Sequence, residues 1–86
     1  MQKLKQSNDE GIGQNLKRLR KRKKYTQIDV VRELEFYGFE ISRTTYNKME
    51  HNNYSIRIKE LLALKLIFDC EFSEFFENLE YPERVI

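Results

Sequence analysis

Residues 42–50, SRTTYNKME, carry side chains whose chemistry suits hydrogen bonding to the base edges of a duplex. Arg43 offers a planar fork of N–H donors that matches the O6 and N7 acceptors of guanine. Thr44 and Thr45 add hydroxyls that can bond to a base edge or a phosphate, and methyl groups that can touch thymine. Lys48 follows about one helical turn after Thr44. A helix that began at these residues would present their side chains to a major groove.

A strongly basic segment lies upstream, where residues 15–24 have the sequence NLKRLRKRKK. The net charge of +2 conceals a division of charge along the chain. Residues 1–27 hold nine Lys or Arg and two acidic residues, whereas residues 28–86 hold seven basic and twelve acidic residues. We expect a chain polarised in this way to offer one side to a polyanion and to turn the other away from it. For the basic run by itself, a solvated helix face is the alternative interpretation.

The composition argues against several classes of function. Cys70 is the only cysteine and His51 the only histidine, so neither an intramolecular disulfide nor a Cys/His zinc site can form. We find no nucleophile–base pair and no phosphate-binding loop, and expect neither an enzyme nor a cofactor. No apolar run approaches the roughly 20 residues that span a bilayer, and the polar N-terminus is unlike a signal peptide. We therefore expect a cytoplasmic protein without a metal site or membrane contact.

The apolar periodicity predicts an all-α fold of five short helices and no strand. Thr26 and Ser42 are typical N-caps, and Gly38 is typical of the turn that ends a helix. The first four expected helices cover residues 11–23, 26–37, 42–50 and 58–68. A short fifth helix is expected to hold Phe72, Phe75 and Phe76 and to end before Pro82. Residues 1–10 are polar and aperiodic and predict a flexible N-terminal tail. One domain is expected over residues 11–78, followed by a C-terminal tail over residues 79–86.

These patterns resemble the Cro/C1-type helix-turn-helix family, also called the XRE family, to which phage repressors belong. The resemblance runs over residues 11–76 and rests on LKRLR at 16–20, YTQ at 25–27, SRTTYNKME at 42–50 and the apolar residues of 61–68. It implies a five-helix, lambda-repressor-like DNA-binding domain. The spacing between the second and third helices is longer than the commonest family pattern, as in a subgroup with a lengthened second helix. Val31 and Lys65 replace an expected alanine, and Asn52 replaces a common glycine.

The resemblance also implies roles for individual residues. It places Arg43, Thr44 and Lys48 at base-contacting positions, and makes Ser42 and Thr45 phosphate contacts or helix caps. Further phosphate contacts are implied or suggested for Gln27, Lys17, Asn53 and Tyr54. In the family, the arginine that ends the LKRLR run pairs with the glutamate that ends the recognition helix. That pair corresponds to Arg20 and Glu50, and its role would be structural.

The C-terminal end is rich in aromatic residues and acidic groups, and both features suit a protein contact that faces away from DNA. We expect a homodimer that uses Phe72, Phe75, Phe76 and Tyr81, although these rings could instead close the core of a monomer. The leading interpretation is a sequence-specific transcriptional repressor acting on a two-fold DNA site. One alternative is the antitoxin of a toxin–antitoxin pair, with a toxin or regulator as protein partner. Another is an interaction module of the same fold that does not bind DNA.

Overall fold

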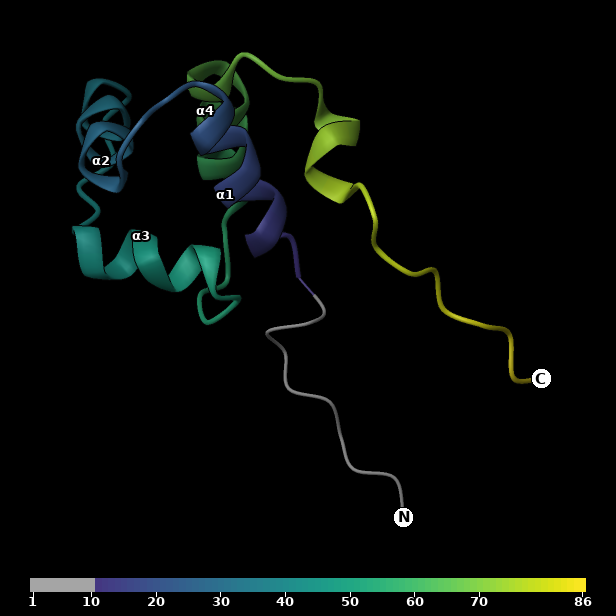
Figure 1. The fold of residues 1–86 in the computed structure, drawn as a ribbon. Coiled ribbons are helices and arrows are strands. Elements are labelled where there is room, and N and C mark those ends of the chain that lie inside the picture. The colour runs from purple at the N-terminus through teal and green to yellow at the C-terminus, as the bar shows by residue number, and fades with distance from the viewer. Residues whose placement is uncertain (1–10) are drawn as a thin grey trace.

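The computed structural model describes residues 11–86, and over this range the chain forms four α-helices, one 3₁₀ helix and no strand (Figure 1). The elements are α1 (Gly13–Arg22), α2 (Gln27–Phe36), α3 (Arg43–Glu50), α4 (Ile58–Phe68) and η2 (Phe72–Phe76). The predicted flexible tail at 1–10 falls outside the described residues. Within residues 11–86, no helix combines the length and apolar character needed to span a membrane.

The all-α prediction is confirmed, but the number of helices needs a correction. The segment predicted as a fifth α-helix is the 3₁₀ helix η2, only five residues long. Its three-residue period places Phe72 and Phe75 on one side, with ring centroids 6.3 Å apart. A segment this short gains little from α-helical hydrogen bonds, so the packing of one aromatic ring decides its conformation.

Local sequence signals explain where the helices begin and end. Thr26 accepts a hydrogen bond from the Asp29 amide, and the Asp29 carboxylate accepts one from the Thr26 amide, which completes a capping box at the start of α2. Gly38 follows α2 with a φ of 90°, a value that a side chain would disfavour. Ser42 caps α3 by accepting a hydrogen bond from the Thr45 amide at 3.1 Å.

The core lies where all five elements meet, and each element contributes at least one fully buried side chain. These side chains are Leu16 and Leu19 of α1, Val30 and Leu34 of α2, Tyr46 of α3, Leu64 and Phe68 of α4, and Phe75 of η2. Their burial gives the main stabilisation of the fold. It also fixes which sides of α1 and α3 remain open to a ligand.

Gly13, which has no side chain, and Asn52, whose backbone is left-handed, allow α1 to approach the end of α3 closely. A side chain at Gly13 would overlap the backbone carbonyl of Glu50. The Gly13 amide donates a hydrogen bond of 2.8 Å to the side-chain oxygen of Asn52, which adopts a φ of 61°. Asn52 therefore performs the turn that glycine often makes in such domains, and its side chain also satisfies an amide at the start of α1.

The segment around η2 is tied to α1 by polar contacts. The side-chain amide of Asn15 donates to the carbonyl oxygens of Phe75 and Glu77 at 2.8 and 2.9 Å. Arg18 donates to the Glu74 carbonyl at 3.0 Å. The bond from the buried Asn15 side chain to the Phe75 carbonyl is itself buried, so it satisfies a backbone group that is shielded from water. The polar contacts fix η2 against the side of α1.

This packing corrects one of the four residues predicted for a dimer contact. Phe75 is fully buried by the protomer's own core, so its ring is not available to a partner. Phe72, Phe76 and Tyr81 remain exposed, by 39%, 51% and 92%. The sequence could not separate these rings, because only the packing of η2 against the rest of the domain decides which one is buried.

Candidate DNA-binding surface

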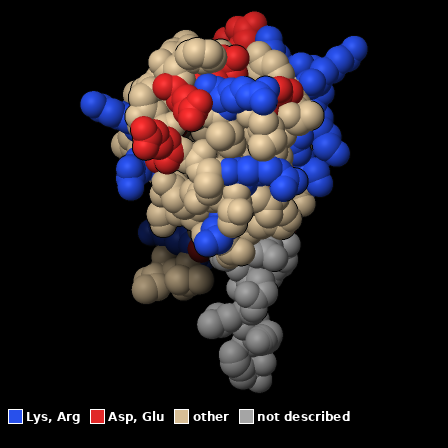
Figure 2. Space-filling model, turned by 90° about the vertical axis from the view of Figure 1, so that its left-hand side faces the viewer, with Lys and Arg blue, Asp and Glu red and all other residues tan. Residues whose placement is uncertain are grey.

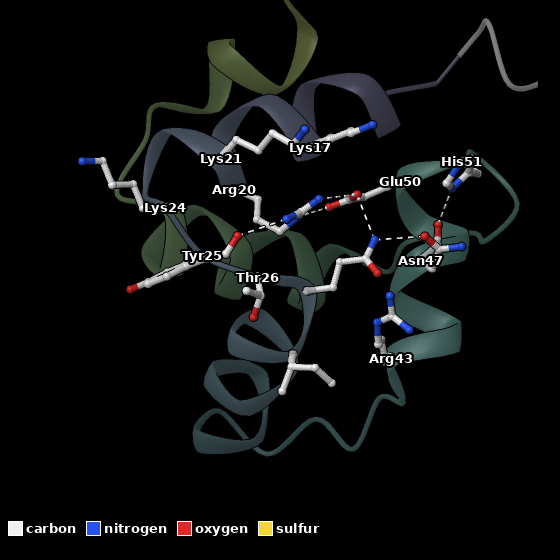
Figure 3. Close-up of a pocket in the computed structure, with 12 residues that line it drawn as sticks. Lys17, Arg20, Lys21, Lys24, Tyr25, Thr26, Arg43, Asn47, Glu50 and His51 are labelled. Carbon is white, nitrogen blue, oxygen red and sulfur yellow. Dashed lines mark hydrogen bonds and ion pairs between the residues drawn. The ribbon is translucent and has the colours of Figure 1, made fainter.

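Contacts divide the basic side chains of α1 into two classes. All three arginines form ion pairs with carboxylates: Arg18 with Glu77 at 3.2 Å, Arg20 with Glu50 at 2.7 Å, and Arg22 with Glu74 at 2.6 Å. Lys17 and Lys21 of α1, and Lys24 just after it, instead line an open groove (Figure 3). Within residues 11–86 these three ammonium groups form no ion pair, whereas each of the three guanidinium groups does.

The groove has a volume of about 950 Å³ and is formed by α1, the start of α2 and one side of α3. We call it the basic groove, and its lining residues are Lys17, Arg20, Lys21, Lys24, Tyr25, Thr26, Gln27, Ile28, Arg43, Asn47, Glu50 and His51. Figure 2 looks onto the side of the molecule that carries α2 and α3, and Lys and Arg gather along its right-hand edge. The groove offers positive charge next to the exposed side of α3, a combination that suits a polyanion.

The floor of the groove is an ion pair that joins α1 to α3. Two of the three guanidinium nitrogens of Arg20, Nε and Nη2, donate to the Glu50 carboxylate at 2.7 and 3.2 Å, and the side chains are only 10% and 1% exposed. Arg20 also donates to the Tyr25 carbonyl at 3.0 Å. This bidentate pair joins α1 to the end of α3, at the two positions for which the family resemblance implied a structural ion pair.

Burial and hydrogen bonding act in opposite directions on Glu50. Desolvation alone would raise its pKa, but the hydrogen bonds it accepts, led by that from Arg20, outweigh this effect and lower the pKa. The Glu50 hydrogen bond in turn raises the pKa of Arg20. Burial, together with the nearby Glu50 charge, raises the pKa of Tyr46, so its phenol remains protonated. The groove floor therefore stays charged and paired at neutral pH.

The first turns of α3 expose the predicted base-contacting groups. Arg43, Thr44 and Lys48 are all exposed, whereas Tyr46 and Met49 point into the core. This division follows the helical period, since residues three and four apart share a face. The structure therefore keeps the three predicted base-contacting side chains on the outside of α3, and Arg43 lies on the wall of the basic groove.

Two predicted phosphate contacts bond to each other at the start of α3. Ser42 accepts the Thr45 amide, and its hydroxyl donates to the Thr45 hydroxyl at 3.1 Å. Ser42 is exposed and Thr45 half-buried. Capping is thus the role that the structure displays for Ser42, while its free lone pair and the Thr45 hydroxyl stay near the surface.

Gln27 bridges two helices through its side-chain amide. The nitrogen donates to the side-chain oxygen of Asn47 at 2.9 Å and to the Glu50 carboxylate at 3.1 Å (Figure 3). The amide predicted to face a phosphate thus also aligns α2 with α3. Asn47 was not among the predicted site residues, although it lies four residues after Arg43 and therefore on the same face of α3.

The other predicted phosphate contacts differ in whether their polar groups are exposed or already hydrogen-bonded within the protein. Lys17 is exposed on the groove wall, and Asn53 is exposed after α3. The Tyr54 hydroxyl instead donates to the buried Glu60 carboxylate at 2.9 Å. Desolvation, followed by that hydrogen bond, raises the pKa of Tyr54. Its donor is thus already used inside the protein.

The single histidine and single cysteine have ordinary surroundings. His51 lies at the groove edge with its Nδ1 atom 2.8 Å from the Asn47 carbonyl. Cys70 is buried, and desolvation raises the pKa of its thiol, which lowers its reactivity. Among the described residues, no group of three or more His, Cys, Asp or Glu could hold a metal ion.

Two helices joined by a turn, with a polar exposed second helix held beside a basic groove, define a helix-turn-helix DNA-binding domain. The family model of the Cro/C1-type HTH DNA-binding domain matches residues 15–78. The chain belongs to this family, and is a DNA-binding transcriptional regulator. No curated protein and no solved structure matches it with significance. The match spans α1 to η2, so the groove and the exposed face of α3 both lie within it.

Proposed function

We propose that this protein is a transcriptional repressor that binds a specific two-fold DNA site as a homodimer. The observation that carries the proposal is the position of Arg43, exposed on the first turn of α3 and facing a groove whose lysines form no ion pair within residues 11–86. Base recognition needs a side chain that reaches into the major groove, and register needs cations that hold the flanking phosphates. The same surface offers both.

In the proposed complex, α3 enters the major groove with its N-terminal turns first. The Arg43 guanidinium donates to guanine O6 and N7, while Thr44 and Lys48 contact neighbouring base edges. Asn47 joins them, since its amide is held by Gln27 on the same face. The buried Arg20–Glu50 pair contributes by keeping α3 at a fixed angle to α1.

Phosphate contacts would flank this base-reading face. Lys17 is the first candidate, because it is exposed on the groove wall and the arginine beside it is already paired. The N-terminus of α2 presents free amides and a positive dipole end, and Gln27 lies in its first turn. Ser42, Thr45 and Asn53 extend the line along the edge of α3. Tyr54 would contribute only if its hydroxyl accepted a bond, since its proton is donated to Glu60.

The homodimer follows from the small number of base contacts that one domain can make. One short helix reaches only a few base pairs, which is too little for high specificity. Two copies related by a two-fold axis would place their α3 helices about 34 Å apart, one turn of DNA. We propose repression because a dimer that bound over a promoter would compete with the polymerase for the same duplex.

Selection of bound sequences from random duplex DNA tests the recognition half of the proposal. Once a site is defined, Arg43→Ala should weaken binding by about 1–3 kcal/mol and relax the base preference at one position of each half-site. Arg32→Ala is a matched control, because Arg32 is an exposed arginine of α2 outside the groove lining. If Arg43→Ala changed neither affinity nor preference, α3 would not be the reading helix.

A promoter that contains the selected site upstream of a reporter gene tests the repression half. Expression of the protein should lower reporter output, and Arg43→Ala should restore it. A rise in output with the unaltered protein would show an activator. Unchanged output despite binding in solution would mean that occupancy of this site alone does not block transcription.

A further inference from the structure

One face of α4 exposes an apolar stripe that the domain leaves uncovered. Ile58, Leu62 and Leu66 follow at intervals of four residues and are 76%, 46% and 59% exposed. The opposite face of the same helix is packed into the core through Leu64 and Phe68, both fully buried. A helix with apolar residues on both faces is typical of one that packs against something on each side.

The C-terminal tail, residues 79–86, is a second apolar surface without a cover. Tyr81, Val85 and Ile86 are 92%, 89% and 98% exposed. Figure 1 shows this segment leaving η2 and running away from the four α-helices. Arg84 donates to the Ile86 carbonyl within the tail at 2.7 Å. The tail therefore extends from the protomer with its apolar side chains in water.

The charges around these two surfaces are complementary. On α4, Lys59 and Lys65 flank the apolar stripe on its two sides, as their positions in the helical period require. In the tail, Glu80 and Glu83 lie among the apolar residues. An acidic and apolar peptide therefore matches an apolar helix face bordered by cations.

Direct pairing of α4 with α4 of a second copy fits less well. An antiparallel pair centred on Leu62 would bring Lys59 of one copy beside Lys59 of the other, and Lys65 beside Lys65, because a two-fold axis places the same flank of each helix on the same side. Two ammonium groups facing each other oppose association.

The length of the tail suits the apolar stripe of α4. Tyr81 to Val85 spans about 13 Å when extended, and the distance from Ile58 to Leu66 along the helix is roughly 12 Å.

We propose that the C-terminal tail of each protomer lies along the apolar stripe of α4 in a second copy, so that two copies exchange tails reciprocally. The inference deepens the proposed homodimer and rests on it. Tyr81 and Val85 cover the ends of the stripe. Glu83 lies between them on the same side of the extended segment, within reach of Lys59 and Lys65, and Glu80 adds a negative charge at the start of the tail. The contact uses neither the basic groove nor the exposed side of α3, and leaves both free for DNA.

Charge reversal in the full-length chain tests this contact by sedimentation equilibrium. Lys59→Glu should raise the dimer dissociation constant at least about tenfold, because it would repel the tail of the other copy. If α4 paired with α4 instead, Glu80→Lys with Glu83→Lys would leave the dimer dissociation constant unchanged, because the tail would take no part in the contact. The response to charge reversal in the tail therefore separates the two arrangements.

Mixing two reversed proteins supplies the decisive measurement. One carries Lys59→Glu and Lys65→Glu, and the other carries Glu80→Lys and Glu83→Lys. Each should be mostly monomeric alone, and an equimolar mixture should regain the dimer, because both contacts in a mixed pair are again between opposite charges. Circular dichroism of each protein checks that the helices remain. Absence of association in the mixture would overturn the tail exchange.

Binding of the selected duplex by the same proteins distinguishes this inference from the proposed function. Two outcomes overturn the tail contact and leave DNA recognition standing. In the first, the protein binds a half-site duplex but is monomeric. In the second, it dimerises whichever of the four charges are reversed. Full-length protein that dimerises as described but binds no duplex overturns the proposed function instead.

Discussion

Replacing Glu50 with alanine should destabilise the fold strongly, because the Glu50 carboxylate is buried beneath the groove surface and pairs there with Arg20. The substitution removes both hydrogen bonds from the Arg20 guanidinium, and Arg20 keeps only the Tyr25 carbonyl. The two side chains are 10% and 1% exposed, so the stranded cation is largely shielded from water. Loss of one partner of a buried pair costs about 3–5 kcal/mol. We expect the lower end, about 3 kcal/mol, because one acceptor remains.

Thermal denaturation measures this loss directly. For a domain of this size each kcal/mol lowers the melting temperature by about 4–8 °C, so Glu50→Ala should melt at least about 12 °C lower. Arg20→Ala and the double variant complete a thermodynamic cycle, in which the double variant should lose much less than the sum of the two single losses. Strictly additive losses would show that the pair does not contribute as a unit.

An exposed ion pair on the same helix is the matched control. Arg22 and Glu74 are 2.6 Å apart, but their side chains are 45% and 21% exposed. Solvent screens such a pair, so Glu74→Ala should lower the melting temperature far less than Glu50→Ala. Equal losses at the two sites would refute the argument, because distance would then matter and burial would not.

Three further predictions concern packing, pH and salt. Gly13→Ala should lower the melting temperature, even though alanine favours helices, because the new methyl group would overlap the Glu50 carbonyl; a higher melting temperature would contradict the close approach of α1 and α3. The pKa of Glu50 is lower in the folded protein than its ordinary value of 4.5. The ion pair therefore contributes its full stability above about pH 4.5, and this stability is lost as the pH falls through the lower pKa of the folded state. Melts of the wild type and Glu50→Gln should therefore differ most at neutral pH and converge in acid. Lys17→Ala should reduce the slope of log affinity against log salt by about one, whereas Arg18→Ala should not, since Arg18 is paired with Glu77; equal slopes would remove Lys17 from the phosphate contacts.

Helix boundaries were predictable because the signals that set them are local. Thr26 with Asp29, Ser42 with Thr45, and Gly38 each act within four residues of sequence. The apolar period likewise identified the buried sides of the long helices. The Cro/C1-type assignment was also predictable from sequence and is confirmed by the family match over residues 15–78.

The fifth element could not be predicted with the same accuracy. Phe72, Phe75 and Phe76 are chemically alike and adjacent, so sequence could not choose among them. In the structure Phe75 of η2 is fully buried, whereas Phe72 and Phe76 remain exposed. That choice depends on Asn15 and Arg18, which bind η2 from more than fifty residues away in the chain.

The sequence by itself determined that this chain is helical, carries its positive charge near the N-terminus and presents Arg43 at the start of a polar helix. Only the tertiary structure decided which cations are free. Lys17 and Arg18 are neighbours and equally basic in sequence, yet one lines the groove and the other is bound to the C-terminal segment. The physical reason is that an ion pair depends on what packs against each side of α1, and those carboxylates come from distant parts of the chain.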